Sequence, residues 1–265
     1  MTGDDFPARE HVEMSASRSC RRFHNFFVAI LISSPTLFSA SICLGQMNST
    51  IDRNSYVVSV QDLKAERKAH VAFEKGSQLL EKGETLASIA YLQQAIAEYP
   101  EHYKAYYDLG VAHFRLTHLT EAEQAFQKAI DLTKGKFAPP QFGLGAVFCH
   151  RSEFPDAERL LQHALELEPG SAAGKYYLGW AQYGLNRFIE AERSLEQALL
   201  RNANFADAYI LLTRIHLRQH NLPAASKDLE SYLKIEPQKE QARTLAEHIK
   251  QEMAQEAAVL AAARP

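Results

Sequence analysis

The sequence predicts an all-α fold, an α-solenoid in which one helix-turn-helix unit is repeated five times. The first observation is a series of small residues that recurs every 34 or 35 positions: Gly76, Gly110, Gly145, Gly179 and Thr213. Three further series keep the same steps: Ser88, Ala122, Ala157, Ala191 and Ala225; Leu92, Phe126, Leu161, Leu195 and Leu229; and Ala95, Ala129, Ala164, Ala198 and Tyr232. Because the four series step together, they indicate one repeated structural unit.

The period and the residue types resemble the tetratricopeptide repeat, a helix-turn-helix unit of about 34 residues. In that family a small residue in the first helix, helix A, lets the second helix, helix B, cross it closely. Proline commonly ends helix B, because it offers no N–H and clashes with the preceding turn. The resemblance implies a right-handed solenoid and covers residues 69–239, with units at 69–102, 103–136, 138–171, 172–205 and 206–239.

The N-terminal segment 1–45 predicts a secretory signal peptide. Residues 26–45 carry no charged side chain, and three arginines lie just before them, between positions 18 and 22. A basic region, an apolar run and small residues near a cut are the parts of such a signal. We place the cut after Gly45.

Two alternatives concern this segment. The first thirteen residues are acidic and suit a signal poorly, so we expect translation to start at Met14. Residues 26–45 could instead remain as a transmembrane anchor, since about 20 apolar residues span a bilayer, although Ser33 and Pro35 interrupt the run. Both outcomes place the repeats outside the cytoplasm, because the basic residues stay inside.

The repeats are expected to lie between a tether and a cap. Residues 46–68 are polar and predict a tether leading into the first helix. Residues 240–265 predict a capping helix, with Ala242 and Ile249 on one apolar stripe. A solenoid needs such a cap because its last repeat otherwise exposes a core face. An interaction helix is the alternative for this segment.

The turns between the helices also have sequence signals. Pro155 and Pro223 occupy the same repeat position, in the first turn of helix B, where proline is tolerated. Thr120 is predicted to be an N-cap, with Glu123 completing a capping box. A longer connection is expected at residues 134–140, where glycine and two prolines interrupt the helical pattern.

Composition and motifs argue against several classes of function. The chain has 29 basic and 32 acidic residues, a net charge of -3, so it lacks the surplus needed to bind nucleic acid. Its cysteines, Cys20, Cys43 and Cys149, form no metal or disulfide framework. The sequence contains no phosphate-binding glycine loop, Gly-x-Ser-x-Gly or His-Glu-x-x-His motif. No catalytic residue, cofactor or metal site is predicted.

Two pairs of residues that include histidine could form a metal site or a catalytic site. His216 and His220 are four residues apart and could meet on one helical turn, but no third metal ligand stands out. Cys149 and His150 are adjacent, which points neighbouring helical side chains in different directions, whereas a thiolate and its base must face each other. We therefore expect surface or groove histidines and a structural cysteine.

The resemblance implies that helix A side chains line a concave groove. Carried over to this sequence, the predicted groove residues are Phe73, Tyr107, Phe114, Phe142, Tyr176, Trp180, Tyr183 and Arg214. Aromatic and arginine side chains dominate binding hot spots, because they bury a large area and still form polar contacts. The alternative is that some of these rings pack between neighbouring A helices.

The resemblance implies a non-enzymatic, exported scaffold that binds a peptide or helix of another protein. The chain is similar to bacterial envelope proteins made of a signal sequence followed by such repeats, which places it in the periplasm or outside the cell. An assembly factor of a secretion or pilus machine is a narrower alternative. A hydrolase that uses Cys149 or a histidine is the alternative from another class. A membrane contact is expected only if segment 1–45 is retained.

Overall fold

The computed structural model describes residues 60–262, and in this range the chain forms eleven α-helices and no strand. The predicted signal peptide, the alternative anchor and most of the tether lie outside the described residues. The helices are α1 Val60–Glu81, α2 Thr85–Glu98, α3 Tyr103–Arg115, α4 Leu119–Thr133, α5 Ala138–His150, α6 Phe154–Leu167, α7 Ala172–Gly184, α8 Phe188–Arg201, α9 Ala206–Arg218, α10 Leu222–Ile235 and α11 Glu240–Ala262. The predicted all-α repeat fold is confirmed.

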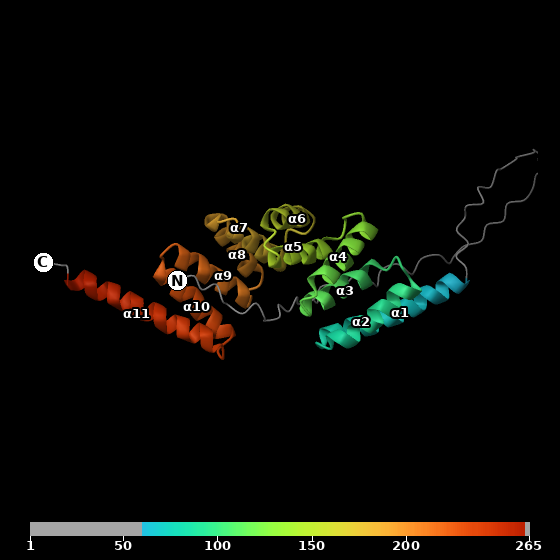
Figure 1. The fold of residues 1–265 in the computed structure, drawn as a ribbon, viewed down its shortest axis with the longest axis horizontal. Coiled ribbons are helices and arrows are strands. Elements are labelled where there is room, and N and C mark those ends of the chain that lie inside the picture. The colour runs from blue at the N-terminus through green and yellow to red at the C-terminus, as the bar shows by residue number, and fades with distance from the viewer. Residues whose placement is uncertain (1–59, 263–265) are drawn as a thin grey trace, which may run out of the picture.

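The helices stack in chain order as five pairs followed by α11 (Figure 1). Each pair packs most closely within itself and then against the next helix along the chain. The odd-numbered helices, which are the A helices, also contact one another from α1 to α9. They form a continuous surface, called here the A-helix face. None of the helices in residues 60–262 combines the length and hydropathy needed to cross a bilayer.

The first helix is longer than expected. It begins at Val60, so residues 60–68 belong to α1 and the predicted tether was too long at that end. Most of this extension is exposed, and packing against the second helix begins near its end, where the Lys68 Nζ atom lies 3.8 Å from Glu98 Oε1 and Ala69 is fully buried.

The repeating residues form the core. Leu92, Phe126, Leu161, Leu195 and Leu229 are all fully buried. In the first four repeats this residue lies against the glycine of its own repeat: a Cβ atom added to Gly145 would lie 2.6 Å from Leu161, and one added to Gly110 would lie 2.5 Å from Phe126. The regular spacing of small and large residues in the sequence therefore arises because helix A and helix B cross closely in each repeat.

In the second repeat the large residue at the helix crossing is a phenylalanine, and a glycine on the next A helix leaves room for it. Phe126 stands where the other four repeats have leucine, and its ring reaches α5 in the next repeat. There a Cβ atom on Gly143 would lie 2.5 Å from Phe126 Cζ. The equivalent position in the other repeats carries a side chain, so Gly143 accommodates the longer ring.

The turns between helix A and helix B share one backbone conformation. Five residues in register have positive φ values of 55° to 80°: Gly83, Thr117, Ser152, Asn186 and His220. This left-handed residue follows the end of helix A, and helix B begins two residues later in all five repeats. Only the first repeat uses glycine, which adopts this conformation most easily.

Helix B of the second repeat starts earlier than predicted, so the predicted capping box does not form. His118 is the N-cap of α4, so Thr120 lies inside the first turn and makes no cap hydrogen bond. Glu123 instead pairs with Arg151, with 2.6 Å between Oε2 and Nη1. The prolines behave as predicted, because Pro155 and Pro223 are each the second residue of their helix.

The last helix caps the array with only part of its length. Ala242, Ala246 and Ile249 are buried against Leu229 and Tyr232 of the fifth repeat. Beyond this contact α11 projects away from the stacked pairs (Figure 1).

Gly143→Ala tests the match between Gly143 and Phe126. The added methyl group would meet the ring, so we expect a net loss of about 1–2 kcal/mol in the free energy of unfolding, after allowing for the better helix propensity of alanine. In a Phe126→Leu background the same change should be neutral or stabilising by up to about 1 kcal/mol. Urea denaturation of the four proteins gives both values. Equal effects in the two backgrounds would contradict the match.

Candidate functional site

The A-helix face carries a continuous row of aromatic rings, called here the ring ladder: Phe114, His150, Trp180, Tyr176 and Phe205. Ring centroids are 5.1 Å apart from Phe114 to His150 and 4.9 Å apart from His150 to Trp180. They are 6.2 Å apart from Trp180 to Tyr176 and 4.7 Å from Tyr176 to Phe205. The ladder runs from α3 across α5 and α7 to the residue before α9, because each A helix places a ring against its neighbour.

Three of the predicted groove residues are buried. Phe142, Tyr176 and Phe114 are 4%, 7% and 8% exposed, and all belong to the central apolar core. Phe142 packs against α7, where a Cβ atom on Gly174 would lie 2.4 Å from its ring. These rings hold neighbouring A helices together, which is the alternative that the sequence left open for them.

The other predicted groove residues are partly or fully exposed. Trp180 is half-buried and keeps an edge toward solvent, while Tyr183 packs on Phe188 with centroids 5.8 Å apart. Phe73 lies against His102 in the first repeats, and Tyr107 lies against Phe126 and Phe137. Arg214 is exposed on α9. The structure brings Phe114, Tyr176 and Trp180 into one row and leaves Phe73, Tyr107 and Tyr183 with other partners.

Of the two remaining members of the ring ladder, His150 is one of the expected groove histidines, whereas Phe205 was not predicted. His150 is exposed although its ring is flanked by Phe114 and Trp180, and this partial desolvation lowers the pKa of the imidazole. A neutral imidazole between two rings behaves as a third aromatic surface. His150 lies eight residues after Phe142 on one face of the same helix, and this spacing can be recognised in the sequence. Phe205 precedes its helix and has no such signal.

Cys149 and His150 do not form a nucleophile and base. The thiol of Cys149 is buried and lies 3.5 Å from the carbonyl oxygen of Tyr177, while His150 points to the ring ladder. Burial raises the pKa of the Cys149 thiol to about 12, so it stays protonated at neutral pH. A protonated, buried thiol is a poor nucleophile. Cys149 is therefore a packing residue.

A polar cluster lies at the N-terminal end of the A-helix face. Asp108 on α3 accepts a hydrogen bond from Ser77 on α1, and Arg115 Nη1 donates to the carbonyl oxygen of Leu80 at 2.5 Å. Burial raises the pKa of Asp108 to about 6, and the hydrogen bond from Ser77 opposes this shift. The two contacts join the first repeat to the second.

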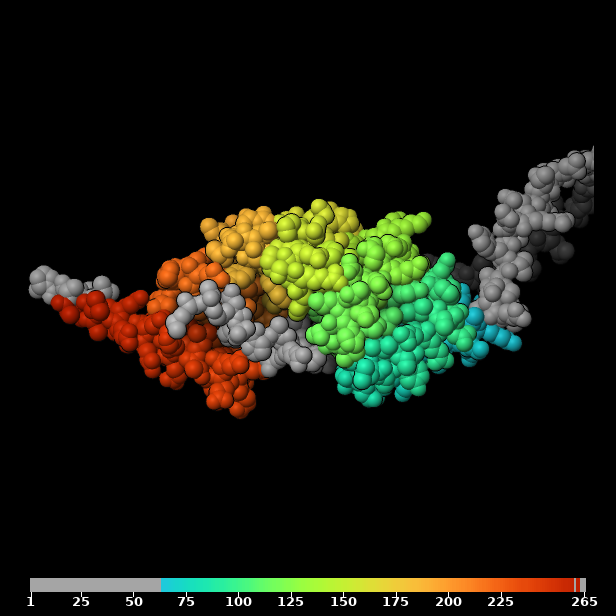
Figure 2. Space-filling model, in the orientation of Figure 1, coloured from blue at the N-terminus to red at the C-terminus, as the bar shows by residue number. Residues whose placement is uncertain are grey.

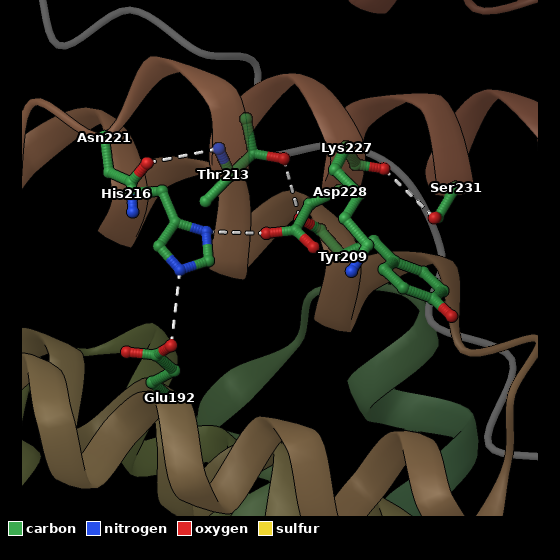
Figure 3. A network of polar contacts seen from close by, with 9 residues as sticks. Glu192, Tyr209, Thr213, His216, Asn221, Lys227, Asp228 and Ser231 are labelled. Carbon is green, nitrogen blue, oxygen red and sulfur yellow. Dashed lines mark hydrogen bonds and ion pairs between the residues drawn. The ribbon is translucent and has the colours of Figure 1, made fainter.

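A second polar network joins the fourth repeat to the fifth (Figure 3). His216 on α9 is 8% exposed, and its Nδ1 and Nε2 atoms lie 2.7 Å from Asp228 Oδ2 and 3.3 Å from Glu192 Oε1. Its two nitrogens therefore face two different carboxylates. His220 lies in the turn after α9 and cannot pair with it as a metal ligand. Within residues 60–262 no group of metal-binding side chains comes together.

Asp108→Asn tests the buried carboxylate. Because burial raises its pKa, the favourable contribution of Asp108 is complete below about pH 4 and is lost as pH rises through about 6. We expect the amide variant to be more stable than the native protein at neutral pH, by at most about 3 kcal/mol, and the difference to vanish toward pH 4. Urea denaturation across this range measures it. The exposed Asp131→Asn is the control, and a pH-independent difference would contradict the prediction.

A known protein family and several solved structures have the same arrangement of paired helices. The family model for the tetratricopeptide repeat matches residues 73–137, 150–191 and 178–240, which together exceed half of the chain. The fold is similar to that of pilF from Pseudomonas aeruginosa, with 16% identity, a TM-score of 0.62 and coverage of 72% of this chain and 86% of that one.

Two further solved structures share the fold. TTC0263 from Thermus thermophilus has 19% identity and a TM-score of 0.58, covering 68% of this chain and 98% of that one. YrrB, described as a tetratricopeptide repeat protein with an unusual peptide-binding site, has 20% identity and a TM-score of 0.52, covering 73% and 99%. At these identities the likeness concerns the fold. By the match to its family model, the chain belongs to the tetratricopeptide repeat family.

Proposed function

We propose that this protein is an exported, non-enzymatic scaffold that binds a peptide or helix of a partner protein on its concave A-helix face. The observation that carries the proposal is the ring ladder, which spans three A helices and leaves His150 and Trp180 partly open to solvent. Repeats of this family and their structural neighbours support a role in protein–protein interaction.

The arrangement suits a ligand with an apolar centre. The buried members of the ladder, Phe114 and Tyr176, fix the positions of the exposed rings, so little rotamer freedom is lost on binding. Trp180 and His150 offer broad aromatic surfaces with a polar edge, which is the chemistry of binding hot spots. The A helices also carry exposed charged side chains, such as Lys104 on α3 and Arg218 on α9.

The narrower alternative is an assembly factor of an envelope secretion or pilus machine. What favours it is the predicted export signal together with the likeness in fold to pilF of Pseudomonas aeruginosa. The hydrolase alternative loses its nucleophile, because the thiol of Cys149 is buried and protonated.

Trp180→Ala tests the binding face. We expect at least a tenfold loss of affinity for a partner captured from an envelope extract, because truncating a hot-spot ring costs more than about 1.4 kcal/mol. The bait is the chain from residue 46 onward, which contains all the described helices and their apolar clusters. Affinity is measured by calorimetry once the partner is purified.

The matched control for this experiment is Phe148→Ala, on the same array but away from the ring ladder. Phe148 is a partly buried ring that packs against the central core, so its loss reproduces the cost in stability. Both variants must keep native helicity by circular dichroism. Equal loss of the partner by both variants would move the binding site away from the A-helix face.

Export is tested separately. A fusion of the whole chain to a reporter enzyme that needs disulfides, such as alkaline phosphatase, should be active in a bacterial host, because disulfides form outside the reducing cytoplasm. Removing residues 1–45 should abolish the activity while the amount of fusion protein stays unchanged. Full activity without these residues would rule out the proposed signal.

A further inference from the structure

We propose that copies of this chain associate head to tail, with the projecting end of α11 from one copy docked on the outer face of α1 and α2 of the next. The outer face is called here the head, and residues 252–262 are called the tail. The ligand is thus a second copy, recognised through complementary charge and exposed apolar surface.

The head is a stacking surface that no repeat precedes within the described residues 60–262. It forms a hollow of about 430 Å³ lined by Lys64, Arg67, Lys68, Val71, Ala72, Tyr91 and Gln94. Val71 is 63% exposed, whereas the residues at the same position in the other four repeats, Ala105, Pro140, Gly174 and Ala208, are all buried. In those repeats the pair that comes before covers the surface.

The second helix of the head shows the same contrast. Tyr91 is 38% exposed, whereas two of its four equivalents, Ala125 and Ser194, are 6% and 9% exposed, and the other two, Leu160 and Asp228, are partly buried. A terminal repeat of a solenoid normally presents a polar outer face. Here the lining combines a tyrosine and a valine with three cations, so the face keeps apolar side chains at positions that are covered in the interior of the array.

The tail has the opposite charge. Residues 254–259 are all exposed, and Val259 is 68% exposed. Glu252 and Glu256 are the charged side chains of residues 251–262, and the negative end of the helix dipole lies beyond them.

The two surfaces have matching patterns. On the head, Lys64, Lys68 and Val71 follow the spacing i, i+4, i+7, which places them on one side of α1. On the tail, Glu252, Glu256 and Val259 follow the same spacing. Parallel docking in register therefore joins two pairs of opposite charge and one apolar pair: Lys64 with Glu252, Lys68 with Glu256, and Val71 with Val259.

The tail cannot reach the head of its own chain. The first repeat and α11 lie at opposite ends of the array (Figures 1 and 2). The contact must therefore join two molecules, and because it uses different surfaces on each, it can continue into a chain of copies. The tail is short and the ion pairs are exposed, so we expect a weak association with a dissociation constant on the order of 10–100 µM.

The test uses two variants, each lacking one surface. Val71→Glu removes the head and Val259→Glu removes the tail, and both positions are exposed, so the fold should be retained by circular dichroism. Sedimentation velocity on the chain from residue 46 onward follows association up to about 500 µM, well above the expected constant. The control is Leu200→Glu, which alters an apolar side chain that is 84% exposed on α8.

The native chain and the control should associate as concentration rises, and each variant alone should associate with an affinity at least tenfold weaker than that of the native chain. Mixing the two variants should give a dimer with one copy of each that grows no further, since only one head and one tail remain. A monomeric native chain would overturn the proposal. Self-association with the native affinity by Val71→Glu alone, through two tails, or by Val259→Glu alone, through two heads, would also overturn it.

A charge exchange tests the register. Lys68→Glu or Glu256→Lys alone should weaken association at least tenfold, because like charges then meet. Combining them in one chain should restore it, since each copy then offers the exchanged pair. Lys68 also has Glu98 within 3.8 Å, so helicity of the first repeat is checked in each variant. A double variant as weak as the single ones would overturn the parallel register.

Discussion

The close crossing of helix A and helix B in each repeat is the constraint on which this structure depends. Gly145 and Leu161 show it in its simplest form, since no room remains for a Cβ atom on the glycine. The crossing fixes which side of each helix is buried. The next repeat must then stack on the helix surfaces that the crossing leaves uncovered, and this places the A helices side by side.

Stacking the A helices gives their aromatic side chains two roles. Tyr176 and Phe142 are buried and join neighbouring helices, whereas His150 and Trp180 lie in the same layer with an exposed edge. A surface supported in this way is rigid before a ligand arrives, which lowers the entropic cost of binding. The same row of rings therefore stabilises the stack and forms the surface that we propose for recognition.

Polar contacts join the repeats where aromatic ones do not. The contact of Ser77 with Asp108 joins the first two repeats, and His216 joins the last two through Asp228 and Glu192. Buried polar groups are costly unless they are satisfied, so such contacts fix one relative orientation of adjacent repeats. In an array whose units touch only their neighbours, these orientations add up to the curvature of the whole.

The sequence by itself determined the helical class, the repeat length and the residues at each crossing, because small and large residues must alternate at fixed intervals for the helices to meet. It also located the prolines in the first turn of helix B. It did not determine that α1 starts at Val60, or that Thr120 lies inside a helix, since a left-handed residue at Thr117 moved the helix start.

Only the tertiary structure decided which aromatic side chains are buried and which keep an exposed edge. Position in helix A shows that Phe142 and Trp180 face the same side, but not that a glycine on the next helix lets Phe142 become buried while Trp180 keeps an exposed edge. That outcome depends on the distance between neighbouring A helices, which is set by contacts between residues about 30 positions apart. Such contacts leave no periodic signal within a single helix.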